Sequence, residues 1–357
     1  MSNILIKQSK YLIEMLKTAR KIKTTLDVFV PDKLFAVIMA GGKGERLWPL
    51  STEQRPKPLI PLDGDLTLLE GTVQRLFPLL LPDHIFVIAD EYSAPAIRSL
   101  LTIPPENVIA EPCRRNTAPC VALATALVKR KSPDAVIIML PADHLISPVT
   151  EFQDDLKRAI ETALEDHLVT LGVQPTYPAP VFGYIRAGEE ISDRIFHVDQ
   201  FKEKPSVELA QQYLDAGNYF WNCGIFIWKV AAIDRAFNRF LPALGEKIAV
   251  WSNGKDYTED FADCEKISID YGIMEKADNV AVRKVTFNWS DVGTPESLYD
   301  LFPKDTAGNA IRAQNADLRD SSGNLICCDD GTEIRISGLN NFTVIKSGNG
   351  LLIKPRS

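Results

Sequence analysis

Continuous apolar runs alternate with amphipathic stretches from about residue 34 onward. The apolar runs predict strands at 35–40, 84–89, 107–110, 134–140 and 168–173. Helical spacing of apolar residues predicts helices at 67–78, 93–101, 117–131 and 151–166. Apolar strands that alternate with helices are typical of a parallel sheet covered on both faces. We therefore predict an α/β fold with a doubly wound, mostly parallel (Rossmann-like) mixed sheet, which binds its ligand at the carboxyl ends of the strands.

The second half of the chain has a different pattern of residues. Residues 181–230 are richer in strand-like segments, and helical patterns follow at 206–216, 231–239 and 268–276. From about Asp305, Asp, Asn, Gly and Ser recur between short β-type pieces, without a clear internal repeat. We expect three parts: an extension over 1–33, a main domain over 34–304 and a small all-β, β-helix-like appendage over 305–357.

The N-terminal extension is basic and amphipathic. Residues 1–25 carry six Lys or Arg against one acid, Glu14, with apolar residues at helical spacing. We expect a helix that docks on the protein or forms a homodimer contact. Disorder and a targeting peptide are the alternatives, although the segment lacks the long apolar stretch of a secretory signal.

Composition narrows the function further. The chain has 357 residues, 45% of them hydrophobic, and a net charge of -7. This balance gives no support to nucleic-acid or membrane-surface binding, and no apolar run approaches the ~20 residues that cross a bilayer. The six cysteines have no Cys-x-x-Cys spacing, so we expect reduced thiols in a cytoplasmic protein.

Three glycines within four positions follow the first predicted strand. Gly41, Gly42 and Gly44 allow turns and close approach, so that successive backbone N–H groups can surround an anion. The cations around and beyond them are Lys43, Arg46, Arg55 and Lys57. This chemistry, placed directly after a strand, suits a nucleoside triphosphate.

Two better-known phosphate loops do not fit. A Walker A loop needs Ser or Thr after Gly-Lys, but Gly44 follows Lys43. A dinucleotide fingerprint needs a small residue where Leu47 stands. The remaining pattern, Gly-Gly-x-Gly-x-Arg-Leu…Pro-Lys, resembles the nucleotidyltransferases that make nucleotide sugars. Glycines alone are a weak signal, so a Gly-rich turn on another α/β fold is the alternative.

Nucleotidyl transfer brings two anions together, so its site needs backbone N–H groups, cations and carboxylates that hold Mg²⁺. Asp143 follows the predicted strand at 134–140, and Asp291 precedes a helix that begins near Pro295. Both are candidate Mg²⁺ ligands, and a turn or helix-cap role is the alternative for each. Arg46 and Lys57 are the candidate triphosphate cations, with Lys43 and Arg55 as weaker candidates.

A second cluster lies in the strand-rich half. Lys204 is a third candidate cation, and Glu203 beside it could accept hydrogen bonds from sugar hydroxyls. A surface charge cluster is the alternative for this pair.

Taken together, the motifs resemble the mannose-1-phosphate guanylyltransferases. The matching segments are 41–51, 56–57, 111–119, 140–146, 182–185, 201–205, 221–226, 268–276 and 289–293. They occur in family order between residues 34 and about 301, and Trp-Pro-Leu-Ser, Arg-Asn-Thr-Ala-Pro and Pro-Ala-Asp-His point to the guanylyltransferase branch. Cys223 departs from the Ser expected in Trp-Asn-Ser-Gly, which puts the choice of sugar in doubt.

The resemblance implies a role for each matching residue. The GTP cradle would consist of Gly41, Gly42 and Gly44, with Arg46 and Lys57 on the phosphates and Asp143 and Asp291 on Mg²⁺. The mannose contacts would be Gly183, Glu203 and Asn222, with Lys204 on the sugar phosphate. The guanine would lie near the turn of Arg115, Asn116 and Thr117. Asp270 could reach the sugar or simply start a helix.

The resemblance implies an enzyme that binds GTP and mannose 1-phosphate and makes GDP-mannose and pyrophosphate with Mg²⁺. Arg46, Lys57, Asp143 and Lys204 would carry the catalysis. A guanylyltransferase for another sugar 1-phosphate is one alternative, and a catalytically silent subunit that senses GDP-mannose is another. The silent subunit could lose Lys57, Asp143 or Asp291, and all three are present.

Overall fold

The structure is a computed structural model that describes residues 31–356. The helix expected over 1–25 therefore lies outside the described residues. The chain folds as two compact units. Of the described residues, the first unit contains 31–41, 73–141 and 147–288, and the second contains 42–72, 142–146 and 289–356.

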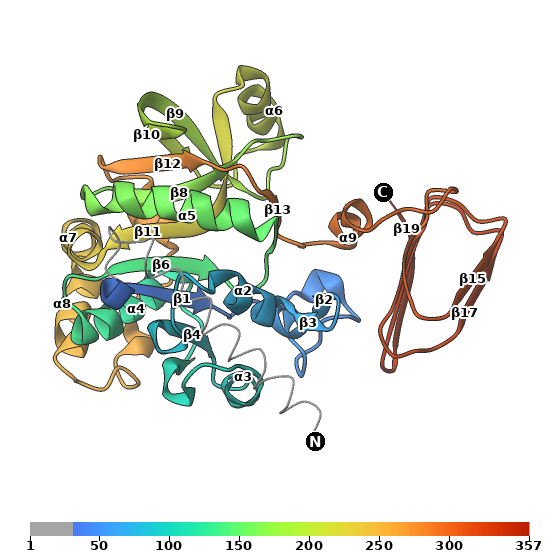
Figure 1. The fold of residues 1–357 in the computed structure, drawn as a ribbon, viewed down its shortest axis with the longest axis horizontal. Helices are drawn as coiled ribbons and strands as arrows, with labels where there is room; N and C mark the ends of the chain where they lie inside the picture. The colour runs from blue at the N-terminus through green and yellow to red at the C-terminus, as the bar shows by residue number, and fades with distance from the viewer. Residues whose placement is uncertain (1–30, 357) are drawn as a thin grey trace. The chain divides into compact units, whose positions relative to one another are not determined.

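A nine-stranded sheet forms the centre of the first unit within the described residues, in the order β5-β4-β1-β6-β11-β8-β12-β10-β9 (Figure 1). Its strands are β1 (Leu34–Met39), β4 (Ile85–Asp90), β5 (Val108–Glu111), β6 (Val136–Pro141), β8 (Leu168–Val173), β9 (Gly183–Ser192), β10 (Ile195–Lys202), β11 (Tyr219–Lys229) and β12 (Val280–Lys284). The five strands predicted in the first half are present with nearly the expected bounds.

The sheet is mixed, and its pairing corrects the expectation of a mostly parallel one. β5, β4, β1 and β6 pair in parallel, as do β8 and β12. β11 enters antiparallel between β6 and β8, and β9 and β10 also pair antiparallel. The run at 168–173 therefore does not continue the parallel series, because a strand that comes later in the chain separates it from β6.

Helices pack around this sheet. They are α3 (Ala94–Leu100), α4 (Thr117–Lys131), α5 (Val149–Leu164), α6 (Val207–Ala216), α7 (Val230–Phe240) and α8 (Pro242–Ser252). The short helices of this unit are η1 (Pro31–Lys33), η4 (Pro82–His84), η5 (Pro105–Asn107), η6 (Phe261–Asp263) and the π-helix η7 (Asp270–Met274). The second unit contains η2 (Glu45–Leu47) and η3 (Lys57–Leu59), and α2 (Leu68–Leu76) begins in the second unit and ends in the first. Between residues 31 and 356, no helix has both the length and the apolar character to cross a membrane.

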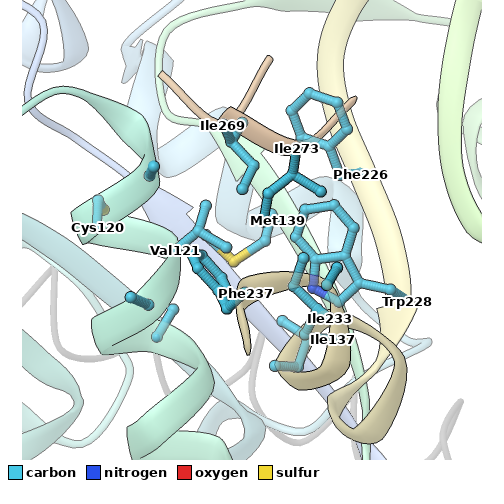
Figure 2. Close-up of a cluster of buried hydrophobic side chains, with 14 of the residues drawn as sticks. Cys120, Val121, Ile137, Met139, Phe226, Trp228, Ile233, Phe237, Ile269 and Ile273 are labelled. Atoms are coloured by element: carbon cyan, nitrogen blue, oxygen red, sulfur yellow. The ribbon is translucent and has the colours of Figure 1, made fainter. Parts of the chain in front are cut away.

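The core of the first unit joins α4, β6, β11 and η7. Figure 2 shows Ile269 and Ile273 directed toward Met139 of β6, with Val121 of α4 and Phe226 of β11 beside them. All five side chains are almost fully buried. The segment at 269–273 is therefore held against the sheet by its apolar face.

The second unit contains the Gly loop and the C-terminal strands. Its strands and helix are β2 (Pro61–Asp63), β3 (Leu66–Thr67), β14 (Ala310–Arg312), β15 (Ala316–Arg319), β16 (Leu325–Cys328), β17 (Ile334–Ser337), β18 (Phe342–Ser347), β19 (Gly350–Pro355) and α9 (Pro295–Leu301). β7 (Leu145–Ser147) and β13 (Asn288–Ser290) form a separate two-stranded pair. β14, β16 and β18 pair in parallel, β19 adds antiparallel, and β15 pairs in parallel with β17.

One apolar core holds the second unit together. Leu47 and Leu50 beyond the Gly loop pack with Val292, Leu325 and Ile345, all fully buried. Residues 305–357 thus share a core with residues 42–72. The domain boundary that the sequence suggested, between residues 304 and 305, stays a proposal. The contacts group the C-terminal strands with residues 42–72, 142–146 and 289–304.

The C-terminal strands contain a repeat that the sequence reading missed. Gly308-Asn309 and Gly323-Asn324 stand directly before the paired strands β14 and β16. The buried amide of Asn324 donates to Asn309 Oδ1 over 2.9 Å, and the Asn309 amide donates to the Ser321 carbonyl over 2.9 Å. The repeat is short and varies between copies, so the stacked Gly-Asn pairs are its only clear signature.

Candidate active site

The Gly loop lies directly against Lys57 and Asp143. Gly44 has a φ of 70°, and a Cβ there would lie 2.5 Å from the Lys57 Cβ. A Cβ at Gly42 would lie 3.1 Å from Asp143 Oδ2. The Ser51 hydroxyl donates to the Gly44 carbonyl over 2.5 Å and thereby stabilises the loop. Only glycine fits at position 44, since that backbone conformation and the close approach both exclude a side chain.

Lys57 is a buried cation, with only 7% of its surface exposed. It begins η3 directly after Pro56. Its Nζ lies 2.9 Å from Asp143 Oδ2 and also donates to the backbone carbonyl of Asp291. A buried ammonium needs such oxygen partners. The structure therefore brings together three of the residues that the sequence selected.

Asp291 sits in a tight turn after β13. Its Oδ1 accepts from the Gly293 N–H over 3.2 Å, and the buried Val292 between them has a φ of 47°. A Cβ at Gly293 would lie 2.7 Å from Asp291 Oδ2 and 3.4 Å from Arg46 Nη2. A β-branched residue rarely adopts that φ, so the turn carries strain of the kind found at functional sites.

The charges around Asp291 partly cancel. Burial raises the pKa of the Asp291 carboxyl, and the negative charge of Asp143 adds to the rise. Lys57, the Gly293 N–H and Arg46 act in the opposite direction. Two carboxylates and two cations therefore interact within this part of the second unit.

The donors fit an open Mg²⁺ site. Within residues 31–356, no cluster of three or more His, Cys, Asp or Glu side chains could enclose a metal ion. Mg²⁺ commonly keeps several waters and binds through one or two carboxylates together with substrate phosphates. Asp143 and Asp291 offer such a pair, with Asp143 Oδ2 2.9 Å from Lys57 Nζ.

The remaining nearby polar residues have structural partners. Arg55 pairs with Asp329 at 2.7 Å and donates to the Leu50 carbonyl, which ties the loop to the C-terminal strands. Lys43 is exposed beside Glu45 at 3.8 Å. His144 accepts at Nδ1 from the Trp289 indole over 3.1 Å.

In the first unit, Gly183, Glu203 and Lys204 are adjacent. A Cβ at Gly183 would lie 2.5 Å from Glu203 Oε2. Lys204 Nζ lies 2.6 Å from Glu203 Oε1. Burial alone would lower the pKa of Lys204, but its hydrogen bond and ion pair with Glu203 raise it overall, with Asp270 contributing.

Asn222 is the fourth predicted sugar contact, and a polar network holds its amide. Its Nδ2 donates to Asp270 Oδ1 over 3.0 Å, and its Oδ1 accepts from the Thr170 hydroxyl over 2.9 Å. Gly224, with a φ of 70°, follows at an irregularity in the pairing of β11 with β8. Irregularities of this kind re-aim side chains near active sites.

Asp270 belongs to this cluster. Burial raises its pKa to about 7, and the charge of Glu203 contributes. Sequence reasoning left its role open and passed over Glu275, whose Oε1 accepts from the Glu203 N–H over 2.9 Å. Both lie in the Ser-Ile-Asp-Tyr…Met-Glu-Lys segment, so that matching motif was the available signal.

Cys223 is turned away from the cluster. Its thiol is buried and donates to the Leu171 carbonyl over 3.2 Å, and burial raises its pKa to about 12. Side chains alternate along a strand, so Cys223 and Asn222 point to opposite faces of β11. The cysteine that replaces the expected Ser therefore faces away from Asn222 and the polar cluster.

The turn at 115–117 precedes α4. Asn116 caps the helix, and its Oδ1 accepts from the Thr117 N–H over 2.8 Å. The Thr117 hydroxyl accepts from the Ile269 N–H over 2.8 Å. Arg115 is partly buried, and its Nε has no hydrogen-bond partner among the described residues. Thr117 therefore bonds to Ile269, a contact that was not expected from its predicted place near guanine.

The mixed α/β sheet and a Gly loop bordered by cations and carboxylates define a protein that handles phosphorylated nucleotides. The chain belongs to the nucleotidyl transferase family, whose model matches residues 35–308. The expected nucleotidyltransferase fold is confirmed at this level.

Individual relatives agree. The chain is 34% identical to the mannose-1-phosphate guanylyltransferase of Klebsiella pneumoniae, over 90% of this chain and 71% of the relative. It is 34% identical to that of Salmonella muenchen, over 91% and 71%. A crystal structure from Thermus thermophilus, named mannose-1-phosphate geranyltransferase, is 35% identical with a TM-score of 0.84, and the match covers 90% of this chain and 95% of that one. The resemblance to mannose-1-phosphate guanylyltransferases is confirmed.

Proposed function

We propose that the protein transfers GMP from GTP to α-D-mannose 1-phosphate, giving GDP-mannose and pyrophosphate. The observation that carries this assignment is the 34% identity to guanylyltransferases over about nine tenths of the chain. The retention of Lys57, Asp143 and Asp291 in one buried cluster supports catalysis rather than silent binding.

The second unit would hold the triphosphate. Backbone N–H groups of Gly41, Gly42 and Gly44 would surround its phosphates, because side-chain-free backbone can approach an anion closely. Arg46, which is exposed, would fork onto phosphate oxygens, and Lys57 would stabilise negative charge on the departing pyrophosphate.

Asp143 and Asp291 would hold Mg²⁺. When bound, a divalent ion of this kind supplies Lewis-acid stabilisation of charge on the reacting phosphoryl oxygens. The carboxylates are suited to it because they are oxygen ligands of the kind that Mg²⁺ binds, one or two at a time, together with substrate phosphates. Lys57 beside them would keep the cluster neutral enough to remain buried before substrate arrives.

The first unit would hold the sugar phosphate. Gly183, Glu203 and Asn222 would contact mannose hydroxyls, since the carboxylate accepts and the amide both donates and accepts. Lys204 would bind the sugar phosphate and orient the attacking oxygen. This nucleophile is already ionised, so the protein needs to neutralise and position it rather than remove a proton. Arg115 and Asn116 would lie on the guanine side.

Three finer points belong to the same proposal. We place the protein in the cytoplasm, because all six cysteines are free thiols. We interpret the sheet around β1 as doubly wound, given its parallel neighbours. We interpret β14–β19 as a short β-helix, given the parallel pairings and the stacked Asn309 and Asn324.

The test is pyrophosphate release from purified protein with Mg²⁺. GTP, UTP, dTTP and ATP would each be paired with mannose 1-phosphate or glucose 1-phosphate. We expect release mainly from GTP with mannose 1-phosphate, abolished by Asp143→Asn and retained by the matched surface control Asp317→Asn. Release with another sugar would replace the substrate assignment. No release from any pair, with GDP-mannose still bound, would make the protein a sensor.

A further inference from the structure

We infer that Thr117 is a positioning residue for the sugar side of the site rather than a guanine contact. Its hydroxyl fastens the start of the π-helix η7, which in turn holds Asn222 and Glu203. The inference rests on the proposed function and changes the role that sequence alone suggested for Thr117.

Two hydrogen bonds clamp α4 to the segment before η7. The Thr117 hydroxyl accepts from the Ile269 N–H over 2.8 Å, and the Ala118 N–H donates to the Ile267 carbonyl over 3.1 Å. The residues are about 150 positions apart in sequence. Ala118 and Ile269 are fully buried, so water cannot replace these partners. The Thr117 bond is the only one of the two that depends on a side chain.

η7 carries groups that touch both predicted sugar contacts. Asp270 accepts from the Asn222 amide over 3.0 Å, and Glu275 at the C-terminal end accepts from the Glu203 N–H over 2.9 Å. The Tyr271 hydroxyl also reaches the Glu203 carbonyl at 3.4 Å. One short element and its C-terminal neighbour therefore hold the Asn222 side-chain amide in β11 and the Glu203 backbone directly after β10.

The other face of η7 is apolar. Ile269 and Ile273 point into the core beside Met139 (Figure 2). Core packing can hold the distance of η7 from the sheet, but it is not directional. The Ile269 N–H bond is directional, so it fixes how η7 is rotated and hence where Asp270 points. π-Helices are rare and occur often at functional sites, which is consistent with this use.

Thr117→Val tests the inference because valine keeps the shape of threonine but cannot accept the hydrogen bond. The buried Ile269 N–H would lose its partner, which is a strong perturbation confined to one end of η7. We expect the KM for mannose 1-phosphate to rise about fivefold or more, with the KM for GTP within about twofold of wild type. Thr117→Ser, which keeps the acceptor, should restore the wild-type value.

Thr125→Val is the matched control. Thr125 lies in the same helix and is fully buried, but its hydroxyl bonds only to the Val121 carbonyl within α4 over 2.8 Å. It should leave both KM values unchanged. Ser268→Ala is a second probe, because Ser268 Oγ accepts from the Tyr271 N–H over 3.2 Å. It should repeat the selective loss even if Thr117→Val fails to fold.

A rise in the KM for GTP alone would overturn the inference and return Thr117 to the guanine side. Equal rises in both values, or none, would also overturn it, since η7 would then not depend on this bond. Wild-type protein that releases no pyrophosphate from GTP and mannose 1-phosphate would instead refute the proposed function. Calorimetric binding of mannose 1-phosphate to Thr117→Val and wild type would still test the positioning role.

Discussion

Replacing Lys57 with methionine should make the nucleotide-free protein bind a divalent metal more tightly. Lys57 Nζ lies 2.9 Å from Asp143 Oδ2, and the two side chains are 9% and 17% exposed. The ammonium therefore occupies one of the two carboxylates that we assign to the metal. A metal ion must share Asp143 with Lys57 or displace it, and methionine removes the competing charge while keeping much of the volume.

The magnitude follows from the geometry. A charge pair at this separation has a Coulomb attraction of about 6 kcal/mol at an effective dielectric constant near 20. Desolvation of both groups offsets most of it, which leaves a net competition of about 1–3 kcal/mol. Each 1.4 kcal/mol corresponds to a tenfold change, so metal affinity should rise about tenfold to a hundredfold.

Mn²⁺ binding, followed by electron paramagnetic resonance and calorimetry on the full chain without nucleotide, measures this directly. Mn²⁺ should also raise the melting temperature of Lys57→Met more than that of wild type. Lys57→Arg, which keeps the charge, should not tighten binding, and adding Asp143→Asn to Lys57→Met should remove the gain. Pyrophosphate release should fall at least about a hundredfold, since we also assign Lys57 to the phosphates. Unchanged or weaker Mn²⁺ binding in Lys57→Met would refute the competition.

Three further changes test other parts of the structure. Gly44→Ala should lower kcat/KM about a hundredfold with unchanged circular dichroism, because its Cβ would lie 2.5 Å from the Lys57 Cβ; near-normal turnover would contradict this. Arg283→Met should cost about 3–5 kcal/mol in urea unfolding, because Asp155, 2.9 Å away, would stay buried without its cation; a loss under about 1 kcal/mol would contradict this. Burial raises the pKa of Glu111 from 4.5 to about 7, with Arg114 opposing and Asp90 adding to the rise. The folded state therefore holds this proton more tightly than the unfolded chain, so stability falls as pH rises through that window. Glu111→Gln should gain about 1–3 kcal/mol over wild type between pH 4.5 and 8, and parallel stability profiles would refute it.

Local signals predicted the elements of the first half well. Helix α4 begins and ends where the pattern placed it, because Asn116 caps its start and its buried apolar residues end at Val128, followed by a last turn of basic residues. β1 and β6 were visible as continuous apolar runs, since both are buried on two faces. α8 was missed, because the predicted helix at 231–239 covers only α7 and α8 begins at Pro242, directly after it.

Strand pairing and hydrogen-bond partners could not be predicted from local sequence patterns. β11 enters the sheet antiparallel between β6 and β8 through contacts far apart in the chain, and no local pattern specifies such a neighbour. The residue types of Lys57 and Asp143 indicated phosphate and metal chemistry, and the family motif placed Thr117 near guanine. Their partners did not follow, because the bond from the Ile269 N–H to Thr117 spans 152 residues.

The two ion pairs in the candidate site differ in what they can control. The Lys57–Asp143 ion pair is largely buried. If it breaks, both charges stay poorly hydrated, so bound ligands must neutralise each of them. Lys204 pairs with Glu203 over 2.6 Å, but its side chain is 60% exposed, so water already competes for it. Under the proposed function, an incoming sugar phosphate would take over the Lys204 ammonium at small cost, whereas release of Lys57 would require a cation that replaces it on Asp143. We therefore expect metal and triphosphate binding to be interdependent, and recognition of the sugar phosphate to depend mainly on how well Glu203 and Asn222 are held.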